Sequence, residues 1–390
     1  MPKLYTALKA LESNRTASLY IHIPFCNSKC SYCDFFSVTD HSLMASVLDK
    51  TIEQTARYID YFGIKHIPTV YIGGGTPSSM PLPLLEKLLS FIGTLPLEKC
   101  AECTMEANPE TINPDLLSLL AGSPINRLSL GIQSFSDATL GTLGRHCNAK
   151  TAIKALKLVK EHWKGSLSLD LISSIPGQEV SDSIADIDTA ISFAPDHISL
   201  YALTLEEGTP LAQRYNPDSQ AIDDNVWIIA ADHLEISGYK RYEVSNFALP
   251  GRQSQHNTRY WKLLPYIGTG PAGVSTLQDG EGGLYRIANV PDLAKYLASS
   301  GLLCGAETEE ITGKSYIFEY LMMGFRMTAG IRKSDFKSTF GREITDMIPG
   351  TLSDWKNKNL LTETEESVAL NKGGLLLLNQ FLLDTLSELE

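Results

Sequence analysis

The chain has 390 residues, of which 43% are hydrophobic and 20% charged, and its formal net charge is −12 at pH 7. This length allows one large α/β domain and a smaller one, while the acidic balance disfavours nucleic-acid binding and electrostatic docking on anionic lipid. The seven cysteines do not indicate a disulfide framework. The sequence shows no signal peptide and no apolar run of the about 20 residues that a transmembrane helix requires. We therefore expect a protein of the reducing cytoplasm.

The first two thirds of the chain alternate strand-like and helix-like segments. Strands are expected at Leu19–Pro24, Thr69–Ile72, Cys103–Ala107, Arg127–Ile132, Ser166–Ile172 and His197–Leu203. Apolar residues at three- and four-residue intervals predict intervening helices, among them Ser42–Tyr61, Leu82–Ile92, Lys150–Trp163 and Ser183–Phe193. Repeated βα units indicate a parallel sheet with right-handed crossovers. Six units are too few for a closed eight-stranded barrel, so we expect a partial, open barrel.

Three cysteines follow the first predicted strand directly. Cys26, Cys30 and Cys33 lie within eight positions of one another. Because Cys thiolates hold iron–sulfur clusters and a cube-shaped cluster takes four ligands, three thiolates would leave one iron open for a small molecule. A closed zinc site would need a fourth ligand, such as Asp34, His22 or a distant cysteine. Inert buried thiols are the remaining alternative, and we favour the cluster.

Polar residues follow the later predicted strands, at the carboxyl ends where parallel barrels gather their chemistry. A glycine-rich stretch, residues 73–78, follows the second strand, and Glu106 closes the third. Gln133 follows the fourth strand, and Asp170 ends the fifth. This placement predicts a single site on one rim of the barrel. The alternative for the two acidic residues is that they only cap helices.

Beyond about residue 238 the chain becomes rich in turns, and from about residue 307 it reads as helical again. Helices are expected at Tyr316–Thr328, Lys333–Phe340 and Leu375–Leu389. We interpret them as a small C-terminal helical domain of winged-helix type. Its leucine-rich run at 375–383 is expected to be a core helix; a peripheral membrane contact is the alternative, although the flank is acidic. The expected domains are residues 1–240, 241–305 and 306–390.

The CxxxCxxC spacing after a strand resembles the radical S-adenosylmethionine (SAM) superfamily, in which SAM chelates the open iron of a [4Fe-4S] cluster. The resemblance implies that Cys26, Cys30 and Cys33 are the cluster ligands. The stretch Gly-Gly-Gly-Thr-Pro-Ser resembles the element that contacts the amino group of SAM. The residues assigned to this contact are Gly74, Gly75 and Thr76.

Further positions match the family's SAM-binding residues. Carboxylates suit the ribose hydroxyls of SAM, and an arginine suits its carboxylate in a bidentate pair. The matching polar residues are Glu106, Gln133, Arg145 and Asp170. Tyr20 and Tyr32 match positions that line the cluster and the adenine; ordinary aromatic core residues are the alternative.

Three segments, residues 127–135, 242–248 and 256–261, narrow the resemblance. They look like the branch that contains oxygen-independent coproporphyrinogen III oxidase and the HemW-type haem chaperone. Phe35 stands where the oxidase has a fourth cysteine, and only 25 residues precede the cluster loop, where the oxidase has a longer extension. Both departures favour the chaperone.

His256 begins the sequence His-Asn-Thr-Arg-Tyr-Trp, which resembles the HNxxYW element associated with haem binding in the chaperone. A neutral imidazole is a standard axial ligand of haem iron, and Tyr260 and Trp261 offer flat surfaces to a porphyrin. From these residue types alone, a histidine hydrogen-bonded in a loop beside core aromatics would be the better interpretation. The resemblance reverses that choice and makes His256 the predicted haem ligand.

Three features depart from the family pattern or stand outside it. The family's Leu-Gly-Arg-x-His reads Leu-Gly-Arg-His146-Cys147 here, so a histidine role at this place is in doubt. Ser174 replaces a glycine after the fifth strand, and its Cβ is expected to narrow the turn. Cys100 and Cys103 have metal-ligand spacing but no partner pair, and we expect them to be structural.

The resemblance implies a carrier that binds a [4Fe-4S] cluster, SAM and haem, and passes haem to an acceptor protein that the sequence does not identify. One alternative is an enzyme that decarboxylates coproporphyrinogen III through a SAM-derived radical, where the protein supplies mainly orientation and shielding. A radical SAM methyltransferase on the same scaffold is the third interpretation. The sequence leaves the oligomeric state open.

Overall fold

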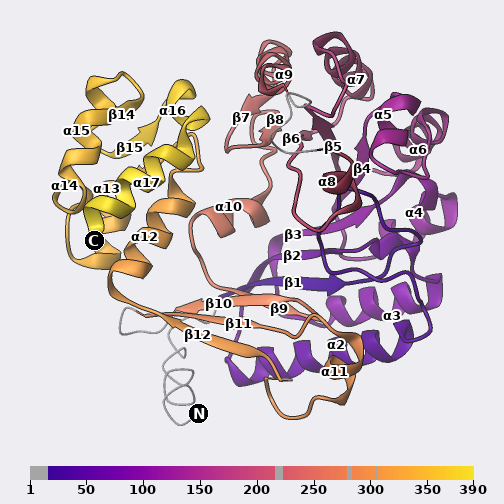
Figure 1. The fold of residues 1–390 in the computed structure, drawn as a ribbon. Coiled ribbons are helices and arrows are strands. Elements are labelled where there is room, and N and C mark those ends of the chain that lie inside the picture. Colours follow the sequence, from indigo (N-terminus) through magenta and orange to yellow (C-terminus); the bar gives the residue numbers. More distant parts are fainter. Residues whose placement is uncertain (1–15, 216–222, 279–282, 304) are drawn as a thin grey trace.

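The computed structural model describes residues 16–215, 223–278, 283–303 and 305–390 (Figure 1). Within these residues, twelve strands form one large sheet and three form a small one. Six strands at the centre of the large sheet pair in parallel in chain order. They are β1 (Ser18–Ile23), β2 (Ile67–Gly74), β3 (Leu97–Ala107), β4 (Arg127–Gln133), β5 (Ser166–Ser173) and β6 (His197–Ala202). These are the six predicted strands, with small shifts at their ends.

The large sheet stays open because β1 and β6 do not pair with each other. Instead, β6 pairs antiparallel with β8 (Asn246–Ala248), which pairs with β7 (Lys240–Arg241). On the other side β1 pairs in parallel with β9 (Tyr266–Thr269). The prediction of a partial, open barrel is confirmed.

Helices cover the outer face of the curved sheet (Figure 1). Helix α6 illustrates why they form where they do: Asn148 caps its first turn by accepting from Thr151 N, and every third or fourth residue is apolar and buried. The main covering helices are α2 (Met44–Tyr61), α3 (Leu82–Gly93), α4 (Pro114–Ala121), α6 (Ala149–His162), α7 (Val180–Ser192) and α9 (Asp224–Ile236). Shorter ones are α5 (Asp137–Thr142) and α8 (Pro210–Arg214). The four named helix predictions are confirmed to within a few residues.

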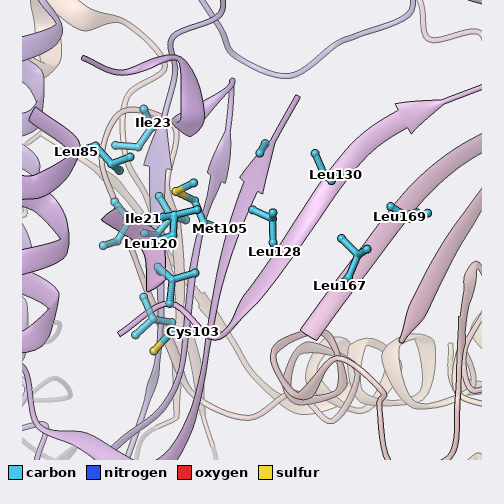
Figure 2. Close-up of a cluster of buried hydrophobic side chains, with 14 of the residues drawn as sticks. Ile21, Ile23, Leu85, Cys103, Met105, Leu120, Leu128, Leu130, Leu167 and Leu169 are labelled. Atoms are coloured by element: carbon cyan, nitrogen blue, oxygen red, sulfur yellow. The ribbon is translucent and has the colours of Figure 1, made fainter. Parts of the chain in front are cut away.

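Side chains alternate between the two faces of each parallel strand. Figure 2 shows outward-pointing residues of β1, β3, β4 and β5 packed with helix residues such as Leu85 and Leu120, and all of these are buried. The inward residues of the same strands are polar or small, for example Ser129 and Gly131 on β4. The barrel therefore has an apolar outer layer and a polar interior.

Leu169 on β5 is 0% exposed in that outer layer (Figure 2). Leu169→Ala is expected to lower the free energy of unfolding by about 2–5 kcal/mol, because it removes buried methyl groups and leaves a cavity. Denaturant titration measures the loss. Ile236→Ala is the matched control, since Ile236 is 84% exposed and its replacement should change stability by less than about 0.5 kcal/mol. Equal losses in both variants would contradict this packing.

The segment expected to be irregular, from residue 241 to 305, contains more structure than predicted. It holds β8, helix α10 (Gln255–Trp261), β9, and the antiparallel strands β10 (Val274–Gln278) and β11 (Leu284–Ala288), then helix α11 (Leu293–Ala298). Strand β12 (Glu307–Ile311) pairs with β11 and ends the sheet. These strands are short, and turns separate them, so their sequence lacked a clear period. Cys103 also lies within β3 rather than at its start.

The C-terminal helices enclose a second cluster of buried residues, which includes Phe336, Trp355 and Phe381. The helices are α12 (Gly313–Gly324), α13 (Lys333–Phe340), α14 (Ile344–Met347), α15 (Pro349–Asn357), α16 (Lys372–Leu376) and α17 (Leu378–Leu389). A three-stranded antiparallel sheet that was not predicted joins them, made of β13 (Ile331–Arg332), β14 (Leu361–Glu363) and β15 (Ser367–Leu370). The expected C-terminal helical region is confirmed; the exact domain limits remain predictions.

The leucine-rich C-terminal run forms two helices rather than one, with Leu377 between them. Leu375 and Phe381 are buried in the second cluster, whereas Leu377 and Leu383 are exposed. The run is therefore an amphipathic part of the C-terminal core. Among the described residues, no helix has the length and hydropathy needed to cross a membrane.

Candidate functional site

A cavity of about 380 Å³ opens at the carboxyl ends of the parallel strands. The loop after β1 forms one wall, and the ends of β2 to β6 supply the others. The predicted site residues that line it are Cys26, Cys30, Tyr32, Cys33, Gly74, Gly75, Thr76, Glu106, Gln133, Arg145 and Asp170. Tyr20 and His256 are the two predicted site residues that do not line it.

Backbone hydrogen bonds fix the cysteine loop at its base. Cys26 N donates to Val38 O at 2.9 Å, and Val38 N donates to Pro24 O at 2.7 Å. Farther along the loop, Ser31 N donates to Leu143 O at 3.0 Å, which ties the loop to the end of α5. The three cysteines are partly exposed toward the cavity. A loop held in this way keeps all three thiols at the wall of one cavity while leaving them accessible.

Two side chains donate hydrogen bonds to the cysteine sulfurs. Arg145 Nη1 lies 3.5 Å from Cys30 Sγ, and Thr76 Oγ1 lies 3.6 Å from Cys26 Sγ. Burial raises the pKa of the Cys26 and Cys33 thiols. Incoming iron must therefore displace protons from these sulfurs, and the resulting thiolates have donors and a cation beside them. The loop fits an anionic iron–sulfur cluster.

The zinc alternative requires a fourth ligand beside the three cysteines. His22 is engaged at both ring nitrogens, Nδ1 with Tyr20 OH at 3.0 Å and Nε2 with Phe36 O at 3.0 Å. Cys103 is buried in the outer layer of β3, on the far side of the sheet from the cavity. Of the candidate fourth ligands, Asp34 lines the cavity together with the three cysteines.

The glycine stretch after β2 passes very close to the cysteine loop. A Cβ on Gly75 would lie 2.7 Å from Phe25 O, and one on Gly74 would lie 2.5 Å from the His22 ring. Gly74 also has φ +109°, a conformation that favours glycine. Any side chain at these two positions would push the loop away, so they need glycine to keep the cavity in shape.

Glu106 and Asp170 lie on the inner face of the barrel, in β3 and β5, where both are partly buried and line the cavity. Glu106 accepts from Tyr71 OH at 2.7 Å and from Gly74 N at 3.2 Å. Burial raises its pKa to about 7; Asp170 acts in the same direction, and the two donors oppose the shift. Burial also raises the pKa of Asp170, which accepts from Ser129 Oγ at 3.1 Å. Because both carboxyls lie in strands, the helix-capping interpretation is wrong.

Arg145 is held at the wall of the cavity by backbone and amide oxygens. Its Nη2 donates to Gly131 O at 2.7 Å and to Asn108 Oδ1 at 3.1 Å. Its Nε is buried without a partner in the described part of the chain. Gln133 has φ +67°, a left-handed backbone conformation that is strained for a residue other than glycine, and it lies at an irregularity in the pairing of β4 with β5. A strained conformation of this kind persists only where the surrounding structure fixes it.

Several cavity residues were missed from the sequence. Asn108 donates to Thr76 Oγ1 at 3.0 Å and accepts from Arg145, so it connects the glycine stretch with the arginine. Tyr201, near the end of β6, lines the cavity and is 42% exposed. The rule that sites lie at strand ends could have found both, because each lies within two residues of a predicted strand's carboxyl end.

The structure also shows where two of the departures from the family pattern lie. Ser174 has φ +57°, the conformation that the family's glycine would favour, but its side chain does not line the cavity. The expected narrowing of this turn by the Ser174 Cβ stays a prediction. His146 is exposed beside the cysteine loop, and Cys147 is buried.

His256 and Tyr20 lie beneath the cavity. The His256 ring is 1% exposed, with Nδ1 at 2.7 Å from Thr69 Oγ1 and Nε2 at 2.9 Å from Tyr260 OH. In this conformation neither nitrogen is available to an iron, so ligation of haem by His256 requires the ring to leave these partners. Tyr20 stacks on Tyr71, with ring centroids 6.1 Å apart.

Comparison with known proteins agrees with this geometry. The profile of the Radical SAM superfamily matches residues 20–190, and that of the HemN C-terminal domain matches residues 311–377. The heme chaperone HemW of Bacillus subtilis is 33% identical over 374 residues, which cover 93% of this chain and 97% of the relative. That of Escherichia coli is 34% identical, with 94% and 97% covered. The chain belongs to the HemW family of radical SAM proteins.

The fold of this HemW-family protein is that of a solved radical SAM enzyme. Coproporphyrinogen III oxidase from Escherichia coli superposes with a TM-score of 0.81, at 20% identity, over 97% of this chain and 92% of the oxidase. At that identity the likeness concerns the fold alone. Membership of the radical SAM superfamily implies a [4Fe-4S] cluster and SAM, which the three thiols and the adjoining cavity fit.

Proposed function

We propose that the protein is a haem chaperone that binds a [4Fe-4S] cluster, SAM and haem, and transfers haem to an acceptor protein in the cytoplasm. The observation that carries this proposal is the match to chaperones named HemW over nearly the whole length of both chains. Phe35 adds support, because it is 64% exposed at the cavity where the oxidase has a cysteine. The acceptor is defined here only by its need for haem.

In this proposal Cys26, Cys30 and Cys33 hold the cluster, and SAM occupies the adjoining cavity. When bound, the cluster supplies an open iron to the amino and carboxylate groups of SAM. The chain's own part is to orient SAM. The residues proposed for this are Tyr20, Tyr32, Gly74, Gly75, Thr76, Glu106, Gln133, Arg145 and Asp170. Tyr20 would act indirectly, since it lies beneath the cavity beside Tyr71.

SAM binding is expected to strengthen as the pH rises through about 7. Hydroxyl groups of SAM donate to the ionised form of Glu106, whose pKa burial raises to about 7. Below that pH, Glu106 must lose a proton for SAM to bind, which makes the affinity at pH 6 about 10-fold weaker than at pH 8, in addition to the dependence that the amino group of SAM brings. Glu106→Gln should remove the part of the pH dependence that Glu106 contributes, and calorimetry on both proteins measures the difference. An unchanged pH profile in the variant would contradict the role given to Glu106.

The function is tested with anaerobically reconstituted protein. Haem titration followed by Soret absorbance should show saturable, stoichiometric binding, and mixing with an apo haem protein should move the Soret band to that acceptor. Incubation with SAM, a reductant and coproporphyrinogen III should yield no protoporphyrinogen. Absence of haem binding, or turnover of coproporphyrinogen III, would overturn the proposal.

A further inference from the structure

A continuous line of contacts joins His256 to the carboxylate in the SAM cavity. The ring of His256, on α10, stacks on Tyr71 of β2, with centroids 5.1 Å apart and an angle of 30° between the planes. Tyr71 OH in turn donates to Glu106 Oε1 at 2.7 Å. One side chain therefore separates the HNxxYW histidine from a residue of the SAM cavity. Figure 1 shows α10 beside the parallel strands, on the side of the C-terminal helices.

The hydrogen bonds of His256 define its tautomer. Thr69 Oγ1 donates to Ser18 Oγ at 2.8 Å, so its oxygen accepts the proton of His256 Nδ1. Nε2 then accepts from Tyr260 OH. Burial lowers the pKa of His256 to about 3, with Arg259 acting in the same direction, so the ring is neutral. The lone pair that an iron would need is the one that Tyr260 occupies.

Tyr71 depends on this ring for its position. Its hydroxyl reaches Glu106, while its aromatic ring is in contact with the rings of His256 and Tyr20. If His256 left, the Tyr71 ring would lose one of these two stacked neighbours in a close-packed interior. The donor to Glu106 would then be free to shift, and the carboxylate would lose part of its preorganisation for SAM.

We propose that His256 is a positioning residue for the SAM site, acting on Glu106 through Tyr71, and that it cannot hold this position while it ligates haem. Binding of haem at His256 and binding of SAM in the cavity are then antagonistic. By thermodynamic linkage, each weakens the binding of the other by the same factor, expected to be about 10-fold. The proposal rests on the SAM site and haem ligand proposed above and adds their mutual regulation.

The chain offers a matched control for His256. His197 on β6 is also buried with both nitrogens engaged, Nδ1 with Ser168 Oγ at 2.7 Å and Nε2 with Tyr242 OH at 2.9 Å. Neither of these partners lines the cavity. His197→Ala should therefore disturb the interior as His256→Ala does, without reaching Glu106.

The first experiment measures SAM affinity by calorimetry on reconstituted Tyr71→Phe, His256→Ala, the double variant and His197→Ala. Each of the first two should bind SAM about 10-fold more weakly. The double variant should be no weaker than the weaker single variant, because both act on the same hydrogen bond. His197→Ala should bind SAM as the parent does. Losses that multiply in the double variant, or equal losses in His197→Ala and His256→Ala, would overturn the proposal.

The second experiment needs no variant and stays decisive if His256→Ala does not fold. Haem affinity of the parent protein is measured with and without saturating SAM, and SAM affinity with and without haem. The proposal is supported if SAM lowers the haem affinity by the same factor by which haem lowers the SAM affinity. If neither ligand changes the affinity for the other, the proposed antagonism is wrong. If the parent binds no haem at all, the haem-chaperone function fails, while the SAM measurements on the variants still decide the positioning role.

Discussion

Replacing Cys26, Cys30 and Cys33 together by alanine should abolish the cluster. The parent protein, purified and reconstituted without oxygen, is expected to hold about four iron and four sulfide per chain. The triple variant should hold almost none, because it removes all three thiols of one anchored loop at the cavity. Iron and acid-labile sulfide analysis, together with visible absorbance, measures the difference.

The control for this variant is Cys100→Ala. Cys100 is exposed at the other end of the sheet, in the first half of β3, and is expected to leave iron and sulfide unchanged. Retention of the cluster in the triple variant, or its loss in Cys100→Ala, would contradict the assignment of the loop. Haem binding by the triple variant should persist, since nothing in the proposed haem site involves these sulfurs.

Arg145→Met should weaken SAM binding by about 100-fold. Arg145 donates from Nη2 to Gly131 O and Asn108 Oδ1 and from Nη1 to Cys30 Sγ, which fixes its positive charge at the wall of the cavity, and its Nε has no partner among the described residues. Loss of a hydrogen bond between charged groups costs about 3 kcal/mol, which corresponds to about two orders of magnitude in affinity. Calorimetry with SAM measures the change, with iron content determined on the same sample.

Two further variants separate charge from geometry at this position. Arg145→Lys keeps the charge but not the planar fork, and should recover only part of the affinity. Arg57→Met removes an arginine from the surface of α2, where it pairs with Glu53, and should leave SAM binding unchanged. Full affinity in Arg145→Met would show that the arginine does not bind SAM.

The parts of the fold that were predicted have strong local periodicity. Strands such as β4 and β5 alternate buried apolar residues with small or polar ones, and helices such as α6 carry a cap and a regular apolar stripe. The cysteine loop was found from spacing alone. Once the parallel order was known, the rule that strand ends meet at one rim predicted that Glu106 and Asp170 share a cavity.

The edge of the sheet was missed because it is held by pairing between distant segments. Strand β9 lies against β1, although more than two hundred residues separate them, and only tertiary contact decides that pairing. The short strands β10 and β11 have no period that their own sequence could reveal. The domain limits that the turn-rich composition beyond about residue 238 indicated remain predictions.

The environment of His256 could not be predicted for a similar reason. Its partners Thr69, Tyr71 and Tyr260 come from two elements, and only Tyr260 is near it in sequence. Residue types at HNxxYW gave no sign that the imidazole would be buried against β2. Its burial is what connects the predicted haem element with the SAM cavity, and the connection appears only in three dimensions.

The most direct test of the account is whether SAM coordinates the cluster that the cysteine loop holds. Reduced protein is mixed with SAM that carries magnetic isotopes in its amino and carboxylate groups, and electron–nuclear double resonance is recorded on the cluster signal. Hyperfine coupling from both groups is the predicted result, because three protein thiols leave one iron open. A cluster signal that SAM leaves unchanged would contradict the account.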